Sequence, residues 1–146
     1  MIYLLRHGAA EDGAEKDDAD RELTDKGRHQ SDAAGRALRV LAPGLEACLS
    51  SPKVRARDTA RIACEHLGLE VEETPELSGG PVDLLALAAG RGDVLLVGHE
   101  PDFSNAIAAV TGAQVKLRKG GLAAIEGRLV HLLLTPSALA AAGGGS

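Results

Sequence analysis

Residues 2–8 read Ile-Tyr-Leu-Leu-Arg-His-Gly, an apolar run that ends abruptly at a charged pair and a glycine. The run is too short for a helix, and an unbroken row of apolar side chains is typical of a strand buried on both faces of a sheet. Arg6 and His7 then lie at the carboxyl end of that strand. This one stretch therefore predicts a buried strand with a cation and an imidazole at its tip.

Two later stretches repeat the pattern of an apolar strand that ends at polar residues. Residues 45–50 form a short, largely apolar stretch that is followed by Ser51. Residues 94–97 are wholly apolar and lead through a glycine into His99. Three buried strands with polar tips are therefore predicted.

Segments with helical spacing of apolar residues alternate with these strands, and two apolar stretches around Gly127 predict a closing hairpin. Alternating strands and helices predict a layered α/β domain with a mostly parallel sheet, to which the hairpin adds an antiparallel edge. The acidic residues 9–21 lack periodicity and are expected to form a mobile loop. Strands are predicted at residues 2–5, 45–50, 69–74, 94–97, 122–125 and 129–134, and helices at residues 25–41 and 52–67, up to residue 87, from residue 102 or 103 to 110 and after residue 135.

The composition restricts the classes of function. The 146 residues carry a net charge of −5, and only 1% of them are aromatic. Affinity for nucleic acid or for anionic membranes needs a basic face, and base stacking needs aromatic rings, so neither partner is expected. The length fits one domain, predicted over residues 1–142, and the glycine-rich residues 143–146 are expected to form a flexible tail.

The two cysteines indicate a reducing compartment. Cys48 and Cys64 lie in apolar surroundings without the spacing of a metal site, so buried free thiols are expected. No stretch approaches the roughly 20 apolar residues that a membrane helix needs, and the first residues lack the charged lead of a secretion signal. We therefore expect a cytoplasmic protein, and the chain is predicted to be monomeric.

Ligands of open α/β sheets bind beyond the carboxyl ends of the strands. This rule brings together residues that are distant in sequence: Arg6 with His7, Arg55 shortly after the second strand, and His99. Two guanidinium groups are suited to bind a phosphoryl group bidentately. Their charges also disfavour protonation of a neighbouring imidazole, which leaves that imidazole available as a nucleophile.

The chemistry predicted for this crevice is transfer of a phosphoryl group to His7, followed by hydrolysis. A nitrogen of His7 attacks phosphorus, Arg6 and Arg55 neutralise the developing charge, and His99 hydrogen-bonds a phosphoryl oxygen. Neither a metal nor another cofactor is required.

Each of these motifs also has a purely structural interpretation. An arginine-histidine pair at a strand end is often only a solvent-exposed polar pair, and the tripeptide Arg6-His7-Gly8 by itself has low specificity. His99 could simply cap the helix that follows it. Surface positions are expected for the other arginines of the second helix and for three further histidines, namely Arg57, Arg61, His29, His66 and His131.

Four motifs, in their order and spacing, resemble the histidine phosphatase (phosphoglycerate mutase-like) superfamily, and specifically its small SixA branch. Each motif is weak alone, but the four together are specific, and they extend from the first residues to the closing hairpin. They are Leu4-Leu5-Arg6-His7-Gly8, Leu23-Thr24-Asp25-Lys26-Gly27 with Gln30, Ser50-Ser51-Pro52-Lys53-Val54-Arg55-Ala56-Arg57-Asp58-Thr59-Ala60, and Gly98-His99-Glu100-Pro101.

The resemblance implies a phosphoglycerate mutase-like fold, a three-layer α/β/α sandwich with a mostly parallel central sheet and an antiparallel edge. It implies His7 as nucleophile, with Arg6, Arg55 and His99 as the phosphate pocket. It also implies a substrate class, because SixA-like members remove phosphate from phosphohistidine on signalling proteins. Substrate contacts or supporting roles are expected for Gly8, Arg21, Ser51, Thr59, Glu76 and Glu100.

One departure from the wider superfamily concerns the proton donor. Phosphomonoesterase relatives carry an acid that protonates an alkoxide leaving group, whereas residues 75–80 here contain only Glu76, and Glu100 is the other candidate. Imidazole leaves phosphorus more easily than an alkoxide, so a missing acid fits phosphohistidine on a phosphotransfer domain or phosphocarrier protein. Two alternatives stay open: a small-molecule phosphomonoesterase and a non-catalytic phosphate-binding module.

Overall fold

Over residues 1–13 and 15–144, which the computed structural model describes, six strands form a single mixed sheet. They are β1 (Ile2–Arg6), β2 (Leu45–Ser50), β3 (Val71–Glu73), β4 (Asp93–Gly98), β5 (Leu122–Glu126) and β6 (Leu129–Leu134). Their order across the sheet is β3-β2-β4-β1-β5-β6. β4 is parallel to β1 and β2, and β2 is parallel to β3, whereas β5 is antiparallel to β1 and to β6. The predicted α/β class with an antiparallel edge is confirmed.

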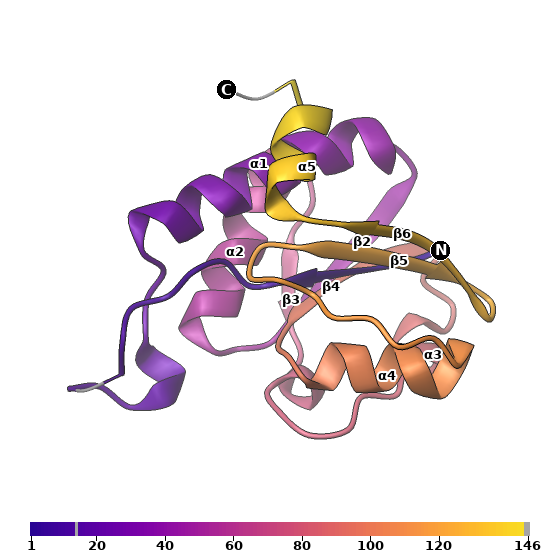
Figure 1. The fold of residues 1–146 in the computed structure, drawn as a ribbon, viewed down its shortest axis with the longest axis horizontal. Helices are drawn as coiled ribbons and strands as arrows, with labels where there is room; N and C mark the ends of the chain where they lie inside the picture. The colour runs from indigo at the N-terminus through magenta and orange to yellow at the C-terminus, as the bar shows by residue number, and fades with distance from the viewer. Residues whose placement is uncertain (14, 145–146) are drawn as a thin grey trace.

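Helices cover both faces of the sheet. They are α1 (Asp25–Leu41), α2 (Val54–Glu65), α3 (Leu84–Ala88), α4 (Asp102–Thr111) and α5 (Pro136–Ala142), with 3-10 turns η1 (Asp18–Asp20) and η2 (Pro75–Leu77). α1, α2 and α5 lie on one face, and α3 and α4 lie on the other (Figure 1). The molecule is therefore the three-layer α/β/α sandwich that the resemblance implies.

The alternation of side chains along β1 divides the core into two layers. Tyr3 and Leu5 pack in the layer that contains α1, α2 and α5, whereas Ile2 and Leu4 pack in the layer that contains α3 and α4. All four side chains are buried. Because this central strand is covered on both faces, its sequence is an unbroken apolar run rather than an alternating one.

A close contact between two glycines holds the start of α1 against the end of β1. A Cβ atom on Gly8 would lie 2.5 Å from the carbonyl oxygen of Gly27, and a Cβ atom on Gly27 would collide with the carbonyl oxygen of Ala9. Thr24 caps α1, because its hydroxyl oxygen accepts a hydrogen bond from the amide of Gly27. These glycines thus permit close packing beside the strand tip.

Three predicted segments differ from the structure in detail. The helix predicted at residues 52–67 is α2, which begins only at Val54 because Lys53 still has an extended backbone. The strand predicted at residues 69–74 is shortened to β3, which lies at the edge of the sheet as expected and pairs only with β2. The predicted loop at residues 9–21 contains η1.

The cysteines, the C-terminus and the helix lengths bear on three smaller predictions. Cys48 and Cys64 are buried free thiols, as predicted. Gly143 is the C-cap of α5, and the flexible tail predicted for residues 143–146 lies partly outside the described residues, which end at Gly144. In the described part of the chain, no helix combines the length and the apolar character needed to cross a membrane.

Candidate active site

A cavity of about 360 Å³ lies at the carboxyl ends of β1 and β4, where the sequence predicts a ligand crevice. The imidazole rings of His7 and His99 meet there, with centroids 5.2 Å apart and planes inclined by 55°. The parallel register brings them together, because Arg6 at the end of β1 is paired with Gly98 at the end of β4. Of the predicted site residues, Arg6, His7, Arg21, Arg55, His99 and Glu100 line this cavity.

His7 is held as a neutral imidazole with one nitrogen available for reaction. Its Nδ1 lies 2.7 Å from the carbonyl oxygen of Gly8. A carbonyl oxygen only accepts hydrogen bonds, so Nδ1 carries the proton and Nε2 has a lone pair. Burial, together with the nearby charges of Arg55, Arg6 and Lys119, lowers the pKa of His7 to about 4, although the hydrogen bond to Gly8 acts in the opposite direction. The ring is therefore neutral at physiological pH.

His99 is a second buried, neutral imidazole. Its Nε2 lies 2.8 Å from the hydroxyl oxygen of Ser51, and its Nδ1 is buried without a hydrogen-bond partner among the described residues. Burial lowers the pKa of His99 to about 3, and the proximity of His7 and Arg55 contributes. An unpartnered buried ring nitrogen is uncommon in folded proteins, and His99 itself lines the cavity.

Arg6 and Arg55 line the same cavity as the imidazoles, and each is anchored to a backbone carbonyl group. Arg6 donates from Nη1 to the carbonyl oxygen of Leu117 at 2.9 Å. Arg55 is buried and donates from Nη1 to the carbonyl oxygen of Asp18 at 2.7 Å. The Nε atoms of both arginines are buried and have no partner within the described chain. Both guanidinium groups therefore retain unused donors.

The sequence interpretation missed four charged residues of this site, which are Asp18, Lys53, Lys119 and Asp102. Lys53 and Lys119 line the cavity. Asp18 pairs with Arg21, Arg55 and Lys53, at 2.9, 3.1 and 3.3 Å. The hydrogen bonds from Arg21 and Arg55 hold the pKa of Asp18 well below its usual range. Nothing in the acidic loop distinguishes Asp18 from its acidic neighbours, because the partner cations come from distant segments.

Three of the predicted site residues, Gly8, Ser51 and Thr59, do not line the cavity but hydrogen-bond to residues of the site. The Thr59 hydroxyl donates to the carbonyl oxygen of Arg55 at 2.7 Å and accepts from the amide of Gly8 at 3.1 Å. It thereby joins α2 to the loop that follows His7. The Ser51 hydroxyl oxygen accepts from the amide of Lys53 and contacts His99. These contacts fix the loop after His7 relative to α2, and Ser51 relative to His99.

The two predicted acids lie in different environments. Glu76 is exposed in η2 and does not line the cavity, although Ser78 from the same loop does. Glu100 lines the cavity, but its two carboxylate oxygens accept hydrogen bonds from the amides of Ser104 and Leu117, at 2.7 and 3.1 Å. Asp102, which the sequence interpretation did not single out, is a second carboxylate on the cavity wall.

Among the histidines predicted to lie on the surface, His66 differs. His29 and His131 are exposed, whereas His66 is half-buried and its Nε2 lies 2.6 Å from a carboxylate oxygen of Asp32. Asp32 belongs to α1 and His66 is the C-cap of α2. The pair therefore joins two neighbouring helices and does not line the cavity.

Taken together, the fold and the cavity define an α/β protein in which cations surround a neutral imidazole with a free nitrogen. Within the described residues, no three His, Cys, Asp or Glu side chains are grouped so that they could hold a metal ion. Cationic donors of this kind suit a tetrahedral oxyanion such as phosphate. The chain belongs to the histidine phosphatase superfamily (branch 1), whose sequence profile matches residues 2–79.

Comparison with individual proteins places the chain near SixA within that superfamily. An uncharacterized protein of Picosynechococcus sp. is 35% identical over 134 residues, which cover 83% of this chain and 81% of the relative. A solved structure described as the protein histidine phosphatase SixA complexed with tungstate has 26% sequence identity to this chain. The two structures superpose with a TM-score of 0.81 over 93% of this chain and 97% of that one. A structure from Agrobacterium tumefaciens, described as a candidate SixA, is 24% identical, with a TM-score of 0.82 over 92% and 97% of the two chains, and supports the fold.

Proposed function

We propose that this protein is a phosphohistidine phosphatase, which hydrolyses phosphohistidine on signalling or phosphocarrier proteins through a covalent intermediate on His7. The observation that carries the proposal is the state of His7. Its Nδ1 proton is engaged by Gly8, its Nε2 is free, and its pKa is lowered to about 4 within a cluster of cations. A module that only binds phosphate would need the cations but not a neutral, oriented imidazole.

In the first step, the lone pair on Nε2 of His7 attacks phosphorus in line with the bond to the substrate imidazole. That P–N bond breaks, and the departing imidazole takes the bonding electrons and a proton from solvent. Arg6, Arg55 and His99 line the cavity that receives the transferring group. They stabilise the charge on its oxygens as it passes between the two nitrogens.

In the second step, water attacks the phosphoryl group on His7. The P–N bond to Nε2 breaks, inorganic phosphate leaves, and the neutral imidazole is restored. The same cations serve both steps, because the phosphoryl oxygens stay in the same cavity. The pKa of about 4 means that His7 regains its reactive form without the removal of a further proton at physiological pH.

The acids of the cavity favour an easily departing imidazole over an alkoxide. Both oxygens of Glu100 are occupied by backbone amides, and Glu76 lies outside the lining. Asp102 supports the second candidate function, a small-molecule phosphomonoesterase, because its carboxylate lies on the wall and caps no helix terminus. As a proton donor, Asp102 would make alcohol phosphates substrates as well.

The deciding experiment compares leaving groups on one enzyme preparation. The proposal expects a larger kcat/KM for a histidine phosphotransfer domain carrying phosphohistidine than for sugar phosphates, phosphoglycerates or p-nitrophenyl phosphate. Equal or better turnover of the alcohol phosphates would assign the phosphomonoesterase function instead. Stoichiometric binding of phosphate without turnover of any substrate would assign the non-catalytic module.

A further inference from the structure

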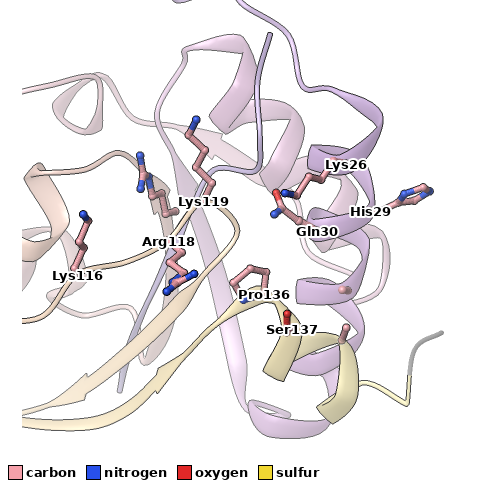
Figure 2. A pocket seen from close by; sticks show the side chains of 11 residues that line it. Lys26, His29, Gln30, Lys116, Arg118, Lys119, Pro136 and Ser137 are labelled. Carbon is pink, nitrogen blue, oxygen red and sulfur yellow. The ribbon is translucent and has the colours of Figure 1, made fainter. Parts of the chain in front are cut away.

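A second, larger cavity of about 820 Å³ adjoins the candidate active site. Arg6 and Lys119 line both cavities, so the two are adjacent. Its walls come from segments far apart in sequence: the start of α1, the start of α5, and the residues that precede β5 (Figure 2). The neighbouring position means that any macromolecule reaching His7 is well placed to cover this groove as well.

The groove carries a concentration of positive charge that is unusual for this chain. Lys26, Lys116, Arg118 and Lys119 line it together with Arg6, and no aspartate or glutamate does. The chain as a whole has a net charge of −5. Lys26, Lys116 and Arg118 are exposed. Neither these three residues nor Lys119 forms an ion pair within the described residues. In the smaller cavity, by contrast, Arg21, Lys53 and Arg55 each pair with Asp18.

The cations border a floor of small and apolar side chains. Ala33 on α1 and Pro136 and Ala140 on α5 contribute to it and are partly buried. In Figure 2, Lys116, Arg118 and Lys119 lie on one side of the cavity and Lys26 on the other, while His29 points away. A groove with an apolar floor and a cationic border suits a protein segment that has both apolar and acidic side chains.

We propose that this groove, lined by Lys26, Lys116, Arg118 and Lys119, binds acidic residues of the phosphoprotein substrate that flank its phosphohistidine. The inference rests on the proposed function, because it names the kind of partner that delivers phosphohistidine to His7. The phosphorylated side chain enters the smaller cavity, and the acidic flank lies along the groove. Exposed cations of this kind add mainly to the association rate and to the choice of partner.

Nucleic acid fits the same charges less well. No Phe, Tyr or Trp lines the groove, so it has no ring on which a base could stack. An apolar floor also has no counterpart in a phosphate backbone, which is recognised through charge and hydrogen bonds. A protein segment with acidic and apolar side chains therefore matches both the apolar floor and the cationic border of the groove.

The test uses two phosphohistidine peptides of equal length that differ only in their flanks, glutamate in one and isosteric glutamine in the other. Three proteins are compared: the wild type, the groove variant Lys26→Glu/Arg118→Glu, and the control Arg39→Glu/Arg128→Glu. Arg39 and Arg128 are exposed, line neither cavity, and provide the same change of charge. Free phosphohistidine is the small substrate, and circular dichroism verifies the fold of each variant.

The wild type and the control should prefer the glutamate peptide about 10-fold in kcat/KM, and the groove variant should lose that preference. Turnover of free phosphohistidine should be equal in all three proteins. Equal use of both peptides by the wild type, or a preference that survives in the groove variant, would overturn the docking site and leave the proposed function standing. Tighter binding of a single-stranded oligonucleotide than of the glutamate peptide would also overturn it. Failure to hydrolyse either peptide and free phosphohistidine would overturn the proposed function itself.

Discussion

The imidazole rings of His7 and His99 lie with their centroids 5.2 Å apart, at the ends of two strands that are neighbours in the sheet but distant in the chain. Each ring is buried, and the proximity of His7 is one cause of the lowered pKa of His99. The cavity around these two neutral imidazoles is lined by more cations than carboxylates, so the site has an excess of positive charge; the cations are Arg6, Arg21, Lys53, Arg55 and Lys119, and the carboxylates are Glu100 and Asp102. Under the proposed function, a phosphoryl group supplies the matching negative charge.

The first prediction concerns the nucleophile. The change His7→Ala should abolish turnover of phosphohistidine and also abolish the acid-labile phosphate label on the enzyme, because no other imidazole of the cavity has the same oriented lone pair. The label is measured after rapid quenching with radioactive substrate. His29→Ala, at an exposed histidine, is the matched control and should label normally. A label that persists in His7→Ala would place the nucleophile elsewhere.

The second prediction concerns the pH dependence of stability. The pKa of His7 is about 4 in the folded protein, compared with an ordinary value of 6.5. Between these values the unfolded chain binds more protons than the folded protein, so the free energy of unfolding must fall as the pH decreases through this window. At pH values above this window His7 is neutral in both the folded and the unfolded state, and at values below it His7 is protonated in both. The free energy of unfolding therefore stops changing with this titration outside the window.

Chemical denaturation should therefore show a loss of about 2 kcal/mol or more between neutral pH and about pH 5. The variant His99→Asn should lose less over the same range, because His99 has a lowered pKa of the same origin. His131→Asn, at an exposed histidine outside the cavity, controls for the removal of an imidazole. A slope that is the same in wild type and His99→Asn would contradict this account of the buried ring.

The third prediction separates the two candidate leaving groups. If imidazole is the natural leaving group, Asp102→Asn should change kcat/KM for phosphohistidine less than about threefold, because this group needs little help from an acid. If an alcohol phosphate is the natural substrate, the same change should reduce its turnover by about 10²-fold or more. Asp83→Asn, at a residue outside the cavity, is the control. Steady-state kinetics with both substrates gives the comparison.

The fourth prediction concerns the hydroxyl that joins α2 to the loop after β1. Thr59→Val keeps the shape of the side chain but removes its bonds to the Gly8 amide and the Arg55 carbonyl oxygen. We expect kcat to fall about tenfold, because His7 and Arg55 lose their fixed relative position. Thr59→Ser should restore both kcat and the pH profile. If the Thr59→Val enzyme has a normal kcat but a lower thermal stability, the Thr59 hydroxyl has only a structural role.

Much of the fold follows from local sequence patterns. The apolar runs predict β1, β2 and β4 because a strand covered on both faces has no polar side to show. The spacing of apolar residues predicts α1 over residues 25–41, which are its observed bounds. The start of α2 was less predictable, since the helix begins at Val54 and Lys53, inside the predicted range, has φ −59° and ψ 136°.

The sequence by itself determined the strands, the polar residues at their tips and the family motifs, because these depend on side-chain type and on spacing along one chain. Only the tertiary structure decided which charged groups come together: Asp18 pairs with Arg55, and Lys26 and Arg118 line the same groove. It also showed that the carboxylate of Glu100 is engaged by two backbone amides. Electrostatic contacts join segments far apart in sequence, and their distance and burial, which set their strength, exist only once the chain is folded.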